Sequence, residues 1–175
     1  MSLNTTTSSS SIQSGESNTF GAVAVPSENF LHQSASVNNP LVNGTGSGQA
    51  NHAVSFNVAT STGGVTIDLT ALTGDGLDGK SRDFSNGGSG GAIKDILIEN
   101  TDPTNTITIS QPASNGWTGF SGAATGFSYP IEPGGHIHLY SPVSGKAVGS
   151  TNKQFVLTSS AGTPNARISA VGIAA

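Results

Sequence analysis

Short runs in which apolar and polar residues alternate are the feature that most constrains the fold of this chain. The segment 129–140 shows the pattern clearly. Its two prolines exclude a helix, and the Pro-Gly-Gly sequence at 133–135 supplies the positive φ that a tight turn requires. In 136–140, Ile137 and Leu139 then alternate with polar residues. Alternation of this kind is typical of a β-strand with one buried face.

The same alternation, interrupted by turn residues, predicts about eight strands after residue 50. No window places apolar residues at helical spacing over three turns. An all-β antiparallel fold follows, a β-sandwich or barrel, with the jelly roll as the natural double-sheet arrangement. The turn sequence at 100–105 predicts that 93–98 and 107–109 pair as a hairpin. The strands are predicted at residues 54–59, 65–70, 93–98, 106–110, 127–131, 136–140, 154–158 and 167–173.

The composition argues against several classes of function. Charged residues make up 9% of the chain, far below the roughly 25% of ordinary soluble domains. The net charge is −4 and the six basic residues are scattered, so binding to nucleic acid is not expected. No run of about 18 apolar residues is present, so no membrane span is expected. Cysteine is absent, which excludes disulfides, and we expect no secretion signal.

Residues 1–50 and 51–175 differ in character, and we expect them to form an N-terminal arm and a jelly-roll domain. Residues 1–18 are almost entirely polar, so this segment alone should be mobile. Residues 19–50 carry apolar residues between turn sequences. We interpret 1–50 as an extended arm that is ordered mainly against another surface; the alternative is two edge strands of the same domain. The expected anchors of the arm are Phe20, Val23, Val25, Phe30 and Leu31.

Residues 74–81 match the spacing of a phosphate-binding P-loop, Gly-x-x-x-x-Gly-Lys-Ser. A phosphate cradle requires a helix that starts at the Lys-Ser pair. Here the sequence continues with the glycine-rich segment 82–91, which cannot hold a helix, and Asp75 and Asp78 would place negative charge beside the phosphates. We therefore interpret the segment as a loop. Its aspartates fail the ligand spacing of an EF-hand, although other calcium sites tolerate varied spacing.

His136 and His138 are the candidate metal ligands. Alternation places both imidazoles on one strand face, which is one way a β-barrel binds a transition metal. The spacing from Pro133 to His138 resembles part of a cupin motif, but that motif ends in Asn where this chain has Pro142. A metal site also needs a third ligand, and none occurs at a suitable spacing. We favour two polar residues on the outer face of a strand; a cupin-like metal-binding protein or enzyme is the alternative.

Trp117 and Phe120 lie in the Gly- and Ser-rich segment 111–126. Such aromatic residues form a sugar-stacking platform, plug the end of a sandwich, or anchor a contact between subunits. A carbohydrate-binding β-sandwich is therefore a second alternative function. No Gly-x-Ser-x-Gly elbow or Ser–His–Asp set can be defended, and Glu99 and Glu132 are expected to be surface carboxylates rather than a glycosidase pair. No catalytic residue is assigned.

With these strands in place, residues 51–175 resemble the jelly-roll decoration proteins, which are accessory head proteins of tailed bacteriophages. The resemblance rests on short segments in a fixed order. They are Ile-Asp-Leu-Thr (67–70), Ile-Leu-Ile-Glu-Asn (96–100), Ile-Thr-Ile (107–109), Ile-Glu-Pro-Gly-Gly-His-Ile-His-Leu (131–139) and Ile-Ser-Ala-Val-Gly-Ile (168–173).

The resemblance implies a non-enzymatic structural protein of the virion, without a cofactor. Its partner would be the major capsid protein. It would assemble in the host cytoplasm and sit on the outer surface of the capsid. Homotrimers are common among such proteins, so a homo-oligomer is expected, with a trimer favoured. The arm would lie along neighbouring shell subunits, with residues 19–37 in contact with the lattice or with other subunits.

Overall fold

The structure of the protein is a computed structural model that describes residues 5–12, 35–74, 81–88, 90–122 and 126–174. These residues form twelve strands and no helix, which confirms the all-β class. A bilayer-spanning helix is absent from the described residues. The strands are β1 (Thr5–Ile12), β2 (Ala35–Asn43), β3 (Gln49–Ala50), β4 (His52–Ala59), β5 (Val65–Asp68), β6 (Ala92–Asn100), β7 (Ile107–Ser110), β8 (Ser128–Ile131), β9 (His136–Tyr140), β10 (Lys146–Ala147), β11 (Gln154–Ser159) and β12 (Asn165–Ile173).

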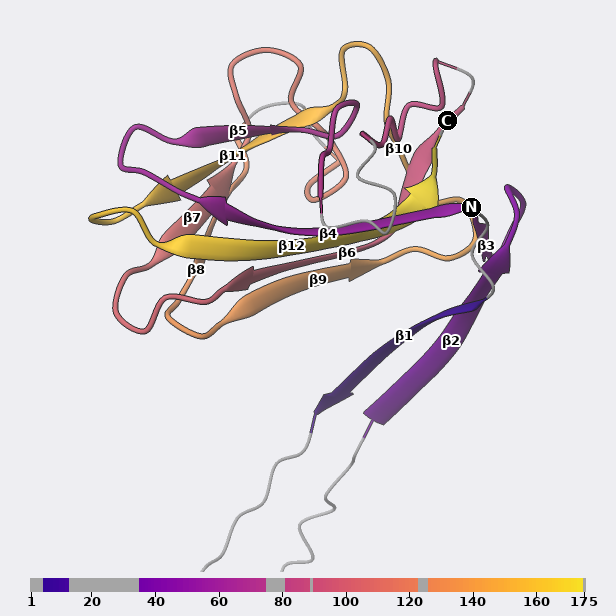
Figure 1. Ribbon diagram of the computed structural model, residues 1–175, viewed down its shortest axis with the longest axis horizontal. Coiled ribbons are helices and arrows are strands. Elements are labelled where there is room, and N and C mark those ends of the chain that lie inside the picture. Colours follow the sequence, from indigo (N-terminus) through magenta and orange to yellow (C-terminus); the bar gives the residue numbers. More distant parts are fainter. Residues whose placement is uncertain (1–4, 13–34, 75–80, 89, 123–125, 175) are drawn as a thin grey trace, which may run out of the picture.

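Eight of these strands form two sheets that face each other as a sandwich (Figure 1). One sheet has the order β9-β6-β12-β4, and the other has the order β5-β11-β7-β8. The short strand β10 pairs with the beginning of β6. All pairs within both sheets are antiparallel, and the chain crosses between sheets at β4–β5, β5–β6, β6–β7, β8–β9, β10–β11 and β11–β12. This is the connectivity of a jelly roll. Each of the eight predicted strands corresponds to one strand of the sandwich.

The predicted hairpin between 93–98 and 107–109 is wrong. β6 pairs with β12, β9 and β10, whereas β7 pairs with β11 and β8. The connection does turn, because Asp102 Oδ1 accepts hydrogen bonds from the backbone N–H groups of Thr104 and Asn105. The turn, however, leads the chain into the opposite sheet. A turn sequence specifies that the chain reverses, but it does not specify which sheet the next strand joins.

Alternation along the strands brings one face of each sheet into a common core. Ile96 and Ile98 of β6 and Phe155 and Leu157 of β11 are completely buried between the sheets. Burial of each such side chain stabilises the fold by roughly 1.5–3 kcal/mol relative to leaving it exposed. The long connections at one end of the sandwich add further large side chains to this core, namely Leu72, Phe84 and Trp117.

The N-terminal part of the chain forms a hairpin arm that projects from one end of the sandwich (Figure 1). β1 and β2 pair antiparallel over eight positions, from Thr5 opposite Val42 to Ile12 opposite Ala35. β1 therefore begins near the sandwich and runs outward, and β2 returns. The sequence predicted an extended arm but a mobile tail for residues 1–18, so the pairing of residues 5–12 was missed.

Candidate functional site

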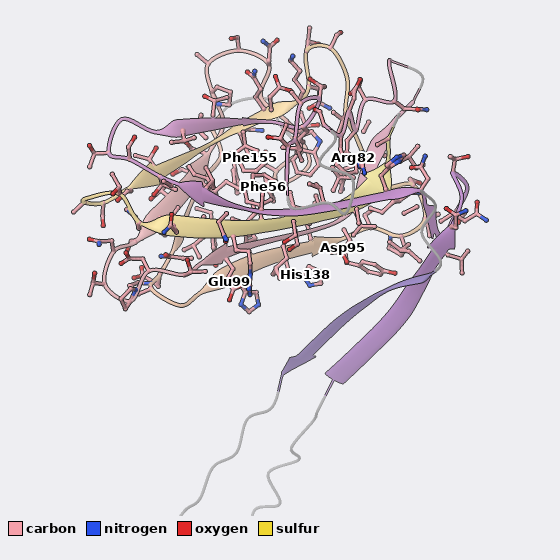
Figure 2. The ribbon with its side chains drawn as sticks, viewed as in Figure 1. Phe56, Arg82, Asp95, Glu99, His138 and Phe155 are labelled. Carbon is pink, nitrogen blue, oxygen red and sulfur yellow. The ribbon has the colours of Figure 1, made fainter. Side chains whose placement is uncertain are left out.

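The two histidines lie on the outer face of the sheet that contains β9. Alternation directs Ile137 and Leu139 toward the core, where both pack against the buried cluster. His136 is exposed and His138 is half-buried. In the register between β6 and β9, His136 lies opposite Glu99 and His138 lies opposite Leu97. Figure 2 shows Glu99, Asp95 and His138 on this outer side of the sheet, whereas Phe56 and Phe155 lie between the two sheets.

Polar side chains on this face are paired with one another across the strands. His138 Nε2 lies 2.7 Å from Asp95 Oδ1. Arg167 of β12 donates from Nη2 to Glu99 Oε2 at 2.6 Å. Burial raises the pKa of Tyr140 above its usual value, and the charge of Asp95 adds to the effect. The carboxylates of this face thus already have cationic or imidazole partners within the chain.

This arrangement agrees with the interpretation of the histidines as two polar residues on the outer face of a strand. A cupin-like site would place both imidazoles inside the barrel, where the structure instead places Ile137 and Leu139. No group of three or more His, Cys, Asp or Glu side chains in the described part of the chain is arranged to hold a metal ion. The placement of two polar residues on the outer face of a strand is confirmed.

Trp117 is part of the core rather than a surface platform. Its side chain is completely buried, and its Nε1–H donates a hydrogen bond to the Ala147 carbonyl at 2.9 Å. Phe120 packs edge-on against Trp117, with ring centroids 5.0 Å apart, and also against Phe155. A sugar ring has no exposed indole face on which to stack. Of the three roles open from the sequence, these residues fill the end of the sandwich.

The P-loop-like segment does not lead into a helix. Leu72 and Arg82 flank its undescribed centre and form an antiparallel bridge, with Arg82 N–H donating to the Leu72 carbonyl at 2.7 Å. Residues 81–88 contain turns and the bridge residue Arg82 instead of a helix. The helix N-terminus that a phosphate cradle requires is therefore missing from residues 81–88, as the interpretation of the segment predicts.

The root of the arm is held to the sandwich by a set of hydrogen bonds that the sequence did not reveal. β3 pairs in parallel with β2 at Val42 and Asn43. The Gly48 N–H donates to the Pro142 carbonyl at 3.0 Å. The Asn51 side chain both donates to and accepts from the backbone of Ala174, at 2.9 Å in each case. Leu41 and Ala50 are completely buried at this junction.

Lys94, on β6 of the β9-β6-β12-β4 sheet, adds further hydrogen bonds at this junction. We call these bonds, together with those of Gly48 and Asn51, the mount of the arm. Its side chain is only 2% exposed, and Nζ donates to the carbonyls of Val143 at 2.7 Å and Pro142 at 3.3 Å. Burial lowers the pKa of the Lys94 ammonium. The Pro142 carbonyl is thus shared between a buried ammonium and the Gly48 N–H of the arm root. A signal existed in the sequence, because Lys94 occupies the same alternation phase as Ile96 and Ile98.

The mount gives the arm a defined direction relative to the sandwich. The bonds at Gly48 and Asn51 join the arm root to the β9–β10 connection and to the C-terminal strand, which are far apart in the sequence. Such a junction restricts swinging of the hairpin about its base. The candidate functional site is therefore the arm together with this mount. The predicted arm anchors Phe20, Val23, Val25, Phe30 and Leu31 lie outside the described residues.

Comparison of the chain with protein-family models, with curated protein sequences and with solved structures found no significant match. Proposals about its function therefore rest on its own residues and their arrangement.

Proposed function

We propose that this chain is a non-enzymatic accessory protein of a viral capsid, which binds the outer surface of the shell as a homo-oligomer. The observation that carries the proposal is the hairpin arm, fixed by its root to a jelly-roll sandwich and projecting from one end of it. Jelly rolls recur in viral capsid proteins. The resemblance of residues 51–175 to phage decoration proteins supports the same function.

The physical logic of the proposal is binding by many weak contacts. The sandwich is stabilised by its own core, so the arm is not needed to complete that core. An arm with a defined direction loses less conformational freedom on binding than a flexible tail does. On a shell with repeated sites, an oligomer links several such contacts, and avidity exceeds the affinity of any single arm.

The test uses particles from a virus that encodes this chain and from which its gene has been deleted. Full-length protein is titrated onto these particles, and bound protein is measured by co-sedimentation. We expect saturable binding at a fixed ratio to the shell protein. Replacing Phe30 and Leu31 together by serine should weaken binding at least about tenfold, because two apolar anchors that become buried are lost.

The matched control is Tyr129→Ser, which removes an aromatic side chain that is 48% exposed, lies on β8, and is outside both residues 19–37 and the arm root. This variant should bind like the unmodified chain, and all three proteins should have the same melting temperature. Failure of the unmodified chain to bind the particles contradicts the proposal. Equal binding by the Phe30/Leu31 variant contradicts the role of the arm.

A further inference from the structure

The two long edges of the arm hairpin differ in how they are blocked. Beyond β2, β3 pairs at Val42 and Asn43. β2 also contains Pro40, which has no N–H group to donate. β1 pairs with β2 alone among the described strands. Natural edge strands are usually blocked by proline, charge, a bulge or a covering segment. The sequence of β1 has neither proline nor charge, and no bulge interrupts its register with β2.

A two-stranded ribbon is also incomplete as a structural unit. An isolated hairpin is marginally stable in water, and independent stability usually requires three or more strands or a packed face. Beyond its root, the arm is such a ribbon in the described part of the chain. Addition of a strand along β1 would supply the missing pairing over eight residues.

We propose that β1 pairs antiparallel with β1 of a second copy of this chain, so that two arms form one four-stranded sheet of order β2-β1-β1-β2. This contact is independent of capsid binding. It predicts a two-fold dimer, because an interface made of the same edge on both partners closes at two copies. A dimer differs from the trimer that the resemblance to decoration proteins implies.

The charge distribution makes the arm the place where a second copy is repelled least. The chain has a net charge of −4, so two identical copies repel each other on average. Only two of its 16 charged residues, Glu16 and Glu28, precede Asp68, and none lies in β1 or β2. The arm is thus where two copies can meet at least electrostatic cost.

The sequence of β1 also suits pairing with itself. It reads Thr-Thr-Thr-Ser-Ser-Ser-Ser-Ile. An antiparallel pair of these strands places hydroxyl residues opposite hydroxyl residues at almost every position, and such cross-strand pairs are favourable. The two-fold axis keeps equivalent residues on the same face of the sheet, and directly opposite residues also share a face, so the longest overlap places Ser8 opposite Ser8, or Ser9 opposite Ser9, of the other copy.

Disulfide trapping tests this register directly, because the natural chain contains no cysteine. Directly opposite residues in an antiparallel pair are close enough for a disulfide. Under mild oxidation, either Ser8→Cys alone or Ser9→Cys alone should form a covalent dimer efficiently, depending on which of the two residues lies at the two-fold axis. A disulfide between Ser8→Cys of one copy and Ser9→Cys of the other should form much less, because residues 8 and 9 lie on opposite faces of the sheet. The matched controls are Asn38→Cys alone and Asn39→Cys alone, which lie opposite Ser9 and Ser8 on β2; neither should crosslink.

Native mass spectrometry of the full chain supplies the second readout. We expect a dimer, and we expect Ser9→Lys to raise its dissociation constant at least about tenfold, because like charges are then held close together across the new pair. Asn38→Lys, one strand further from the interface, should change it about twofold or less. A chain that remains monomeric overturns the proposal. An oligomer whose dissociation constant is unchanged by Ser9→Lys also overturns it. So does a disulfide between Ser9→Cys and Asn57→Cys, on the exposed edge strand β4, when no disulfide forms between two β1 strands.

Discussion

Asn100→Asp is the substitution that tests the jelly-roll crossover most sharply. Asn100 is completely buried at the end of β6. Its Nδ2 group donates to the carbonyls of Asn105 at 2.8 Å and Ile131 at 2.9 Å, and its Oδ1 accepts from the Asp102 N–H at 3.0 Å. One side chain thus joins the β6–β7 connection to the end of β8. Aspartate has nearly the same shape but replaces the NH₂ donor by an acceptor oxygen.

The magnitude follows from the two lost donors. A buried polar group left without its partner costs about 1–3 kcal/mol. Two carbonyls lose their donor and a carboxylate oxygen faces them, so we expect a loss of about 3–5 kcal/mol in the free energy of unfolding at pH 7. For a chain of this size that corresponds to a fall of roughly 6–20 °C in melting temperature.

The pH dependence gives a second signature. Burial beside two carbonyls should raise the pKa of the new carboxyl above its value in the unfolded chain. The protonated acid regains one O–H donor, so the variant should recover part of its stability at low pH and lose it as the pH rises through the raised pKa. Urea unfolding of both proteins at several pH values measures this difference.

Asn165→Asp makes the same chemical change at an exposed position and serves as the control. It should alter the free energy of unfolding by about 0.5 kcal/mol or less. A loss below about 1 kcal/mol for Asn100→Asp, or a loss that does not depend on pH, would refute the reasoning.

Three further predictions concern the sandwich. Burial acts to raise the pKa of Asp68, but hydrogen bonds from Thr70, Gln154 and Lys153 outweigh it and lower the pKa to about 2. Asp68→Asn should cost about 1 kcal/mol at pH 7 and abolish the part of the stability that is lost as the pH falls from about 4 to about 2, measured by urea unfolding. Gly119→Ala places a Cβ atom against the Trp117 ring and should cost about 1–3 kcal/mol, whereas Gly149→Ala, in open space, should change the melting temperature little. Arg167→Ala breaks an ion pair whose arginine is 53% exposed, and thermal unfolding should show a loss below about 1 kcal/mol.

The positions of the sandwich strands could be predicted because apolar residues, which become buried, alternate with polar residues along each strand. Ile137 and Leu139 identify the inward face of their strand, so the outward placement of His136 and His138 followed from the same pattern. Which strands pair with one another was harder to predict from the sequence. The turn after Asn100 was recognised, but the buried hydrogen bonds that direct the next strand into the other sheet depend on the Ile131 carbonyl, which is distant in sequence.

The arm and its mount were largely hidden from sequence reasoning. Residues 5–12 are almost uniformly Ser and Thr, so they have no alternation that would mark a strand, and their partner β2 begins only at residue 35. Lys94 was counted among scattered basic residues, although its phase matches buried neighbours. The hydrogen bonds of Gly48 and Asn51 join segments from both ends of the chain, and no local pattern predicts such contacts.

The most direct test of the proposed function is the composition of purified particles. Particles from cultures that produce this chain are isolated on a density gradient, and the chain is quantified against the major shell protein by mass spectrometry. Accessory capsid binding predicts that the chain migrates with DNA-containing particles at a constant ratio to the shell protein, and that protease added outside intact particles cleaves it. A chain that stays at the top of the gradient while the particles sediment without it would contradict the account.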